Sequence, residues 1–446
     1  MAVEELGIQP VPKEQRTGKW LDLFAINFAF GINPLYFIFG ALGVITFDLP
    51  LWWAVAGLLV GQLIGYSILA TVAHMGSDHG IPGQVGMRAF LGFHGAKLSS
   101  AYRTIAALYW FATQAITTAY ALQALLEPLA GWELRVVPTA LVLAAAQAVL
   151  AVLGFDVLRY ATKVILPLGV AFLAVILGLY MSSDDPKFAV GRVFDSPEQN
   201  LSWVGFSAYV TLIVGSQLTF LPSIADFARY TRSRRDSDIG LYGSAILSAL
   251  VVTFVGGFGA IAVSETRSPF DIATDLTGNE AILAFLCLAV IVQCVGVNVI
   301  NAYSVGMSLA NIFPKAGRVR ATAVGAVVGI ALSAVPDFLN SAEDWIIHLG
   351  NVASPMAGVV MVDYLIVKRQ RIDVPGLYEA RGPYTYFKGV NLAAMVSIAA
   401  GVAVYYVVPH DIIRFAWALG VGAVLYAVLE RAQRGMPDFA DPRARG

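Results

Sequence analysis

Charged residues are scarce in this sequence of 446 residues, where Asp, Glu, Lys and Arg together make up 13% of the chain. Soluble domains carry about 25%, so a water-soluble fold is excluded. The formal net charge of -1 and the lack of a dense basic block argue against nucleic acid as a partner. Cysteine is nearly absent. Cys287 and Cys294 lie seven residues apart in one apolar run, so they share a helix face and cannot form a disulfide with each other.

Hydrophobic residues make up 58% of the chain, and the mean hydropathy is +0.70. They occur in runs of about 20 residues, the length that a helix needs to cross a hydrocarbon layer of roughly 30 Å. The sequence therefore predicts an all-α polytopic membrane protein with about 12 transmembrane helices. We expect these helices near residues 20–46, 51–75, 98–125, 135–154, 160–181, 200–226, 239–263, 280–310, 320–336, 345–367, 388–408 and 411–430.

The distribution of Lys and Arg predicts how these helices are oriented. If residues 1–19 are cytoplasmic, 24 of the 29 basic residues fall in cytoplasmic segments and five in external ones. Short cytoplasmic loops carry an excess of Lys and Arg, so this orientation is the favoured one. We therefore expect a protein integral to the cytoplasmic membrane, with both termini in the cytoplasm.

Two apolar segments contain residues that a lipid-facing helix tolerates poorly. The first includes Gly31, Ile32, Asn33 and Pro34, and the sixth includes residues 215–222, which read GSQLTFLP. Proline removes a backbone donor and glycine relaxes the backbone, so both segments should unwind near mid-membrane. Ordinary proline kinks are the simpler explanation. Paired breaks in the first and sixth spans instead favour an inverted-repeat transporter, in which such breaks form the substrate site.

Four polar side chains lie at the depth of these breaks. They are Gln114, Gln217, Thr219 and Gln293. A single buried Gln is usually explained by a hydrogen bond between helices, but four such groups favour a ligand cavity. Because they carry no charge, we expect a neutral, planar ligand rich in donors and acceptors, such as a nucleobase. Trp110, one helical turn before Gln114, offers a stacking surface.

Several motifs then resemble those of one transporter family, the nucleobase:cation symporters of the cytosine and purine permease type. The resemblance runs from about residue 10 to 375 and depends on the order and spacing of the motifs rather than on any one of them. The motifs are residues 80–95 (GIPGQVGMRAFLGFHG), Arg103, residues 109–114 (YWFATQ), 214–216 (VGS), 225–230 (ADFARY), 302–304 (AYS), 310–312 (ANI) and 362–369 (VDYLIVKR).

This resemblance implies a leucine-transporter-type fold, with a 5+5 inverted repeat, two further helices and alternating access. The corresponding segments are a cytoplasmic tail at 1–19, a first repeat at 20–181, a second at 200–367, two accessory helices at 388–430 and a cytoplasmic tail at 431–446. The residues that it implies for substrate binding are Trp110, Gln114, Gly215, Ser216, Gln217, Thr219 and Gln293. Gln217 replaces an aromatic residue that stacks on the substrate ring in relatives.

The eighth span departs from the family in its ion site. Sodium in this fold is held by carbonyls of the first span and hydroxyls of the eighth, which are hard oxygen ligands. Residues 281–299 contain no Ser or Thr, and Gly296 and Val297 occupy the hydroxyl positions. We therefore expect coupling to protons, or another ion site that uses Asn298, rather than the usual sodium site. The candidate proton carriers are Asp22 and His348.

Two alternatives remain open on sequence alone. An amino-acid or amine carrier of the same fold needs no charged side chain, because broken helices can bind both ends of an amino acid. A membrane metalloenzyme would use His74, Asp78, His79 and His94, although solvated loop residues are the simpler explanation. No nucleophile, phosphate-binding or cofactor motif is present. We therefore predict a non-enzymatic importer without cofactor or bound metal, whose partners are a heterocyclic solute, a coupling cation and the lipid bilayer.

Overall fold

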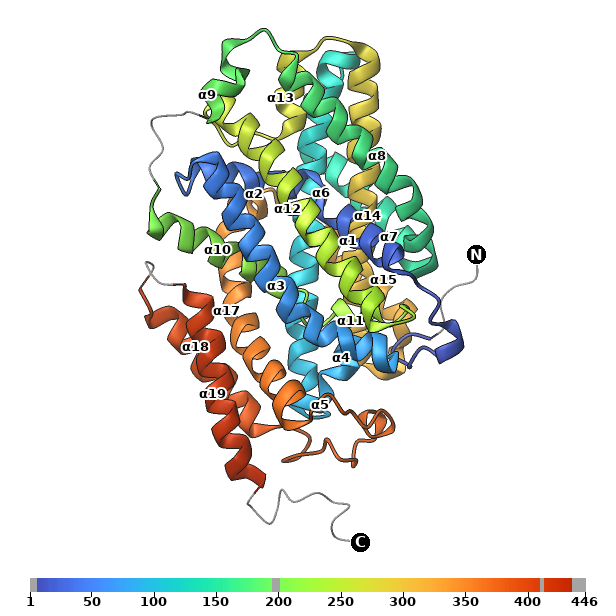
Figure 1. Ribbon diagram of the computed structural model, residues 1–446. Coiled ribbons are helices and arrows are strands. Elements are labelled where there is room, and N and C mark those ends of the chain that lie inside the picture. The colour runs from blue at the N-terminus through green and yellow to red at the C-terminus, as the bar shows by residue number, and fades with distance from the viewer. Residues whose placement is uncertain (1–5, 154, 195–200, 410–412, 435–446) are drawn as a thin grey trace.

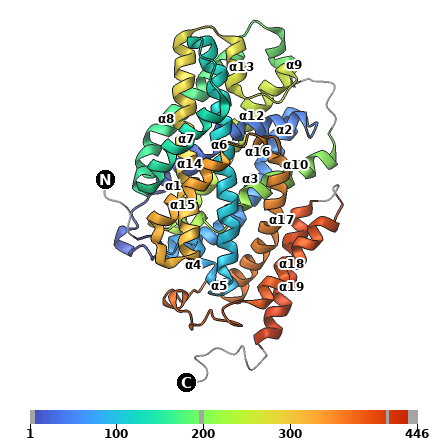
Figure 2. The ribbon, with the colours of Figure 1, turned by 180° about the vertical axis from the view of Figure 1, so that it is seen from behind.

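The computed structural model describes residues 6–434 except 154, 195–200 and 410–412, so most of the predicted C-terminal tail lies outside the described residues. Over these residues the protein is helical, with two isolated β-bridges. The long helices run lengthwise through the molecule (Figures 1 and 2). Their bounds are α1 Trp20–Gly31, α2 Pro34–Ile45, α3 Leu51–His79, α4 Gly83–Gly86, α5 Arg88–Leu91, α6 Ala96–Ala130, α7 Val136–Leu153, α8 Phe155–Met181, α9 Val190–Phe194, α10 Trp203–Leu218, α11 Ile224–Ala228, α12 Arg234–Val263, α13 Pro269–Leu276, α14 Glu280–Ile312, α15 Gly317–Leu332, α16 Asp337–Asn340, α17 Ala342–Met361, α18 Leu392–Val407 and α19 Arg414–Arg434.

Every predicted apolar segment coincides with a helix or a pair of helices to within several residues. Six helices of the described chain are long and apolar enough to cross a membrane, or seven if α1 and α2 are counted as one bent span. The all-α polytopic architecture is therefore confirmed, whereas the count of about 12 spans stays a prediction.

The first predicted break lies between α1 and α2, whose axes meet at 62°. Asn33 replaces the lost helical partners there. Its Oδ1 accepts hydrogen bonds from the backbone N–H groups of Leu35 and Tyr36 at 3.0 and 3.2 Å, and its Nδ2 donates to the Phe30 carbonyl at 2.5 Å. Pro34 occupies the first position of α2, where its missing N–H costs nothing. A break at membrane depth is tolerated because one side chain satisfies these groups.

The second predicted break lies between α10 and α11. Its backbone turns tightly, so that the Phe220 N–H donates to the Gln217 carbonyl at 2.9 Å and the Ser223 N–H to the Phe220 carbonyl at 2.8 Å. These three-residue turns satisfy groups that the α-helix no longer pairs. Pro222, which has no N–H to donate, lies among them.

The helices pack in two groups. The first comprises α6, α7, α14 and α15, and the second comprises α1, α2, α3, α10 and α12. The helix α8 contacts both groups, through α14 and α1, and α17 packs on α10 as well as on the last two helices. Both breaks belong to the second group and face α6 of the first. The interface between the groups is therefore the place where the predicted site residues meet.

Three arginines that belong to the predicted cytoplasmic segments are buried. Arg88, Arg103 and Arg229 are 4%, 0% and 0% exposed. Arg88 donates to Asn311 Oδ1 and to the Leu377 carbonyl, at 3.1 and 2.9 Å. Arg229 donates to the Gly7 carbonyl at 2.9 Å and to the Tyr303 hydroxyl at 3.0 Å. These three side chains therefore act as buried donors that join segments distant in sequence, and their count as cytoplasmic charges stays a prediction.

We predict that Asn33→Ala destabilises the protein by about 1–2 kcal/mol, the usual cost of losing a helix cap. The change leaves two buried N–H groups and one carbonyl without their partner. Thermal unfolding of the purified protein in detergent measures the effect. Thr139→Ala, which removes a hydroxyl bonded to its own helix at an exposed position, serves as the control. Equal stability of the two variants would contradict this role for Asn33.

Candidate functional site

Trp110 and Gln114 lie one turn apart on α6, on the face that meets the breaks. Both side chains are buried, with exposed fractions of 3% and 1%. The Trp110 indole Nε1 donates to the Thr219 hydroxyl at 3.1 Å, and that hydroxyl donates to the Ser216 carbonyl at 2.6 Å. One hydrogen bond thus ties the predicted stacking residue to the second break.

Gln217 joins the second break to the first. Its Nε2 donates to the Tyr36 hydroxyl at 3.4 Å. The Phe30 ring packs edge-to-face against both Tyr36 and Phe220, with centroids 5.4 and 4.6 Å apart. Sequence reasoning did not select Tyr36 or these rings, although Tyr36 follows the Asn-Pro break by only two residues. The two breaks therefore share one aromatic cluster.

Gln114 and Gln293 lie at the same depth on neighbouring helices. The thiol of Cys294, the residue after Gln293, donates to the Gln114 carbonyl at 3.6 Å. Gln293 is 0% exposed, and neither its nitrogen nor its oxygen has a hydrogen-bond partner within the described chain. The Gln114 side-chain nitrogen also has none. An unpaired buried polar group costs about 1–3 kcal/mol, so these amides suit a ligand that can bond to them.

Arg103 is the site-proximal residue that sequence reasoning missed. It lies two turns before Trp110 on α6, and its Nη1 donates to the Thr219 carbonyl at 3.2 Å. Its guanidinium also lies over the Phe220 ring, 4.0 Å from the centroid. The expectation that no fixed charge is buried near the site was therefore wrong. A signal was present in the sequence, because Arg103 falls seven residues before Trp110 and so shares its helix face.

Three other predicted positions have different surroundings. Asn298 donates to the Phe111 carbonyl at 3.0 Å and to Gln147 Oε1 at 2.7 Å, so its nitrogen joins α14 to α6 and α7. Its oxygen accepts a weaker bond from Asn301. These bonds favour a structural role over the predicted ion site. Gly215 packs against α17, where a Cβ on Gly350 would lie 2.8 Å from its Cα, and the Ser216 hydroxyl donates to the Ile213 carbonyl.

Isoleucine side chains pack against Gly169 and against Gly296, a position that the resemblance assigns to a sodium ligand. A Cβ on Gly296 would lie 2.6 Å from Ile165 Cδ1, and a Cβ on Gly169 would collide with Ile32 Cδ1. Ile32 and Ile165 are 0% and 1% exposed. Sodium needs oxygen ligands, and these contacts supply hydrocarbon instead.

The candidate proton carriers lie away from the breaks. Asp22 caps the start of α1 by accepting the Lys19 N–H at 2.8 Å, and His348 contacts the Tyr406 hydroxyl at 3.0 Å. Neither contact involves a predicted site residue. Their roles as proton carriers stay predictions.

Two of the four residues considered for a metalloenzyme contact other side chains of the protein. His74 Nε2 lies 2.7 Å from Asp238, and Asp78 pairs with Arg234. Over the described ranges, no three His, Cys, Asp or Glu side chains are grouped closely enough to hold a metal ion.

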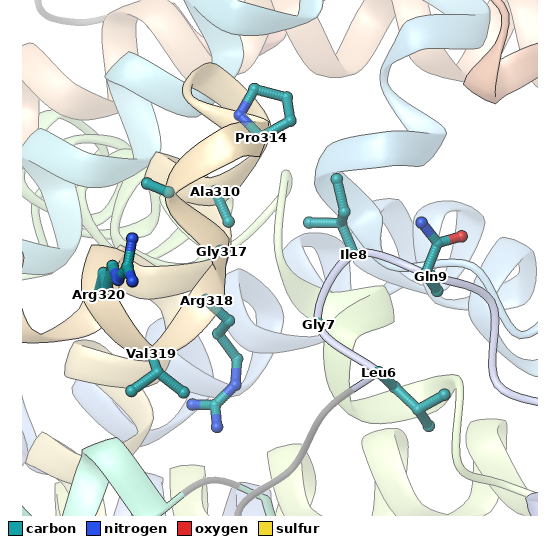
Figure 3. Close-up of a pocket in the computed structure, with 11 residues that line it drawn as sticks. Leu6, Gly7, Ile8, Gln9, Ala310, Pro314, Gly317, Arg318, Val319 and Arg320 are labelled. Atoms are coloured by element: carbon teal, nitrogen blue, oxygen red, sulfur yellow. The ribbon is translucent and has the colours of Figure 1, made fainter.

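One cavity of about 530 Å³ lies between residues 6–9 and the corner where α14 leads into α15 (Figure 3). Arg318 and Arg320 line it, but none of the predicted site residues does. It is therefore separate from the two breaks.

A helical membrane protein whose broken first and sixth spans face a tryptophan and buried amides belongs to the class of secondary transporters with the leucine-transporter-type fold. The family described as "Permease for cytosine/purines, uracil, thiamine, allantoin" matches residues 10–429. The chain is a member of this nucleobase:cation symporter family, which comprises permeases rather than enzymes.

Curated relatives and solved structures agree with this assignment. The allantoin permease of Bacillus subtilis is 26% identical over 95% of this chain and 92% of its own length. The hydantoin permease of Microbacterium maritypicum is 24% identical over 90% and 83%. The closed structure of Mhp1, a nucleobase-cation-symport-1 family transporter with bromovinylhydantoin bound, matches with a TM-score of 0.83, at 22% identity over 98% of both chains. The predicted fold is thus confirmed.

We predict that Thr219→Val lowers the free energy of unfolding by about 1–3 kcal/mol, because the buried Trp110 N–H loses its acceptor. Thr219→Ser, which keeps the hydroxyl, should retain most of the free energy of unfolding. Thr211→Val is the matched control, since that hydroxyl bonds only within α10, to the Ser207 carbonyl. Thermal unfolding compares the three variants, and a Thr219→Val protein as stable as the control would refute the coupling.

Proposed function

We propose that this protein imports a neutral, planar, nucleobase-like heterocycle by alternating access, driven by protons rather than sodium. The observation that carries the proposal is that Trp110, which shares its helix with the buried amide of Gln114, bonds to the second break, which Gln217 joins to the first. Such an arrangement suits a flat guest, which stacks on the indole while its ring heteroatoms bond to amides. No carboxylate side chain belongs to this group of residues, so an ammonium group would depend on backbone carbonyls at the helix ends alone.

The names of the relatives support this class of substrate. Allantoin and hydantoin, for which two relatives are named, and bromovinylhydantoin, which is bound to Mhp1, are ring compounds with several N–H and C=O groups. Trp110 would stack on such a ring, and Gln114 and Gln293 would bond to its edge. Gln217, which is bonded to Tyr36, would close the site from the second break.

The proposed orientation defines which side of the protein must open to release an imported solute. The charge distribution favours cytoplasmic termini in a cytoplasmic membrane. Arg229 and its bonds to the N-terminal residues would then lie on the cytoplasmic side. Uptake would require the two helix groups to move apart on this side after a ligand has bound at the breaks.

We predict that heterocycles stabilise the purified protein against heat, whereas amino acids do not. A ligand that binds only the folded state raises stability in proportion to RT ln(1 + [L]/Kd). Hydantoin, allantoin, uracil, cytosine and purines form the panel, with leucine and phenylalanine as the alternative class. Stabilisation by amino acids alone would favour an amino-acid carrier and contradict the proposal.

The same assay tests the site residues. Gln114→Leu should weaken binding of the best heterocycle about tenfold, the effect of losing one buried hydrogen bond of about 1.4 kcal/mol. Gln123→Leu, nine residues further along the same helix and half-exposed, is the matched control. Equal affinities of the two variants would exclude Gln114 from the site.

We predict that replacing sodium by potassium changes the initial uptake rate by less than about twofold, because Gly296 offers no hydroxyl ligand and packs against the side chain of Ile165. Uptake of radiolabelled substrate into proteoliposomes measures this rate. Acidifying the outside should accelerate uptake if protons drive it. A rate that collapses without sodium would overturn the proposed coupling.

A further inference from the structure

The amides at the breaks can adapt to many ligands, but the guanidinium beside them cannot. A Gln side chain can rotate to present either its donor or its acceptor. Gln114 and Gln293 therefore accommodate a ring carbonyl or a ring amino group equally well. Arg103 only donates, because a guanidinium has no acceptor atom. Any preference between the two kinds of substituent must then come from a fixed group such as Arg103.

Arg103 lies close to where the ring would stack. It donates to the carbonyl of Thr219 at 3.2 Å, while Trp110 donates to the hydroxyl of the same residue at 3.1 Å. The guanidinium and the indole thus bond to two oxygens of the same residue, Thr219. Phe220, over which the guanidinium lies, belongs to the aromatic cluster that joins the breaks.

Two of the three guanidinium nitrogens have spare donors. Arg103 is 0% exposed, and its Nε and Nη2 have no hydrogen-bond partner among the residues that the structure describes. Asp226 is a nearby carboxylate, and it accepts a hydrogen bond from the Gly83 N–H at 2.9 Å. In a low-dielectric interior such a cation strongly favours electron-rich oxygens and disfavours the positive hydrogens of an amino group.

The unpaired acceptors of the same helix surface do not offset this bias. Gln293 Oε1 also has no partner among the described residues, but the nitrogen of the same side chain is unpaired too, so this residue adds as many free donors as acceptors. Asn301 Oδ1 and Ser304 Oγ also lack partners over the described ranges. They lie eight and eleven residues beyond Gln293, which is about 12 Å or more along α14. The polar groups that remain near Trp110 are therefore weighted towards donors.

We propose that Arg103 is a specificity-determining residue that makes the site select cyclic imides and ureides over amino-substituted rings. In the favoured class an acidic N–H lies between two carbonyl groups. The inference rests on the transport function proposed above and narrows its substrate class. The preference arises from the charge and the hydrogen-bond donors of Arg103 rather than from ring size. It should therefore hold for both five- and six-membered rings.

Two pairs of compounds with the same ring size differ in this respect. Uracil carries a carbonyl group where cytosine carries an amino group. In the same way, 1-methylhydantoin carries a carbonyl group where creatinine carries an amino group. Titration of thermal stability gives a Kd for each compound. We expect at least a tenfold preference for uracil over cytosine and for 1-methylhydantoin over creatinine. A tenfold ratio of Kd values is the effect of gaining or losing one buried hydrogen bond.

Variants of Arg103 test whether this residue causes the preference. Arg103→Met should reduce both ratios to about threefold or less, and Arg103→Lys, which keeps a charged donor, should retain most of the preference. Arg318→Met is the matched control, because Arg318 is also buried, at 5% exposure, but lies on α15 away from the breaks. A purely structural role would lower the affinity for both members of a pair and leave their ratio unchanged.

The possible results distinguish failure of the proposed role of Arg103 from failure of the proposed transport function. Ratios near one, or a preference for the amino compounds, in the unaltered protein would overturn the inference and leave the proposed function intact. The same ratios in Arg103→Met and the unaltered protein would remove Arg103 as the cause. Binding of neither pair, with binding of amino acids, would defeat the proposed function itself. Should Arg103→Met fail to fold, the ratios of the unaltered protein and of Arg103→Lys still decide.

Discussion

The constraint on which this structure depends is the need to satisfy backbone groups inside an apolar layer. Each break frees N–H and C=O groups that lipid cannot pair. Asn33 supplies both kinds of partner at the first break, and three-residue turns supply them at the second. Because the backbone is satisfied locally, the side chains around it are free to serve a ligand. The hydrogen bonds that stabilise the breaks are therefore a condition for selective ligand binding at this site.

The polar groups around the breaks divide into two sets with different roles. The Trp110 indole, the Gln217 nitrogen and Asn298 are bonded to the protein and hold helices together. Gln293, the Gln114 nitrogen and two nitrogens of Arg103 have no hydrogen-bond partner in the part of the chain that is described. Burying such groups costs free energy that packing does not return. A ligand that pairs them recovers this cost, which gives the transporter an affinity that depends on the ligand's chemistry.

Much of the fold could be predicted from the sequence, since the length of an apolar run and the positions of Gly and Pro are local properties. Both breaks and all apolar segments were predicted in this way. The burial of Arg103 was not, because helix ends rich in Arg usually lie in water and only the packing of α6 on the second break removes this one from solvent. The hydrogen bonds of Asn298 could not be predicted either. Its partners, Phe111 and Gln147, are more than 150 residues away, and no pattern in the sequence places them beside it.

The most direct test of the account is whether a heterocycle shields the second break. The chain's two native cysteines, Cys287 and Cys294, are first replaced by Ala, so that a cysteine introduced as Gln217→Cys can be followed by its own rate of alkylation. Gly278→Cys, at an exposed position with open space around it, provides the unshielded reference. We predict that a saturating heterocycle slows alkylation at position 217 at least fivefold and leaves position 278 unchanged. Equal rates at position 217 with and without a ligand that the protein transports would contradict the placement of the site.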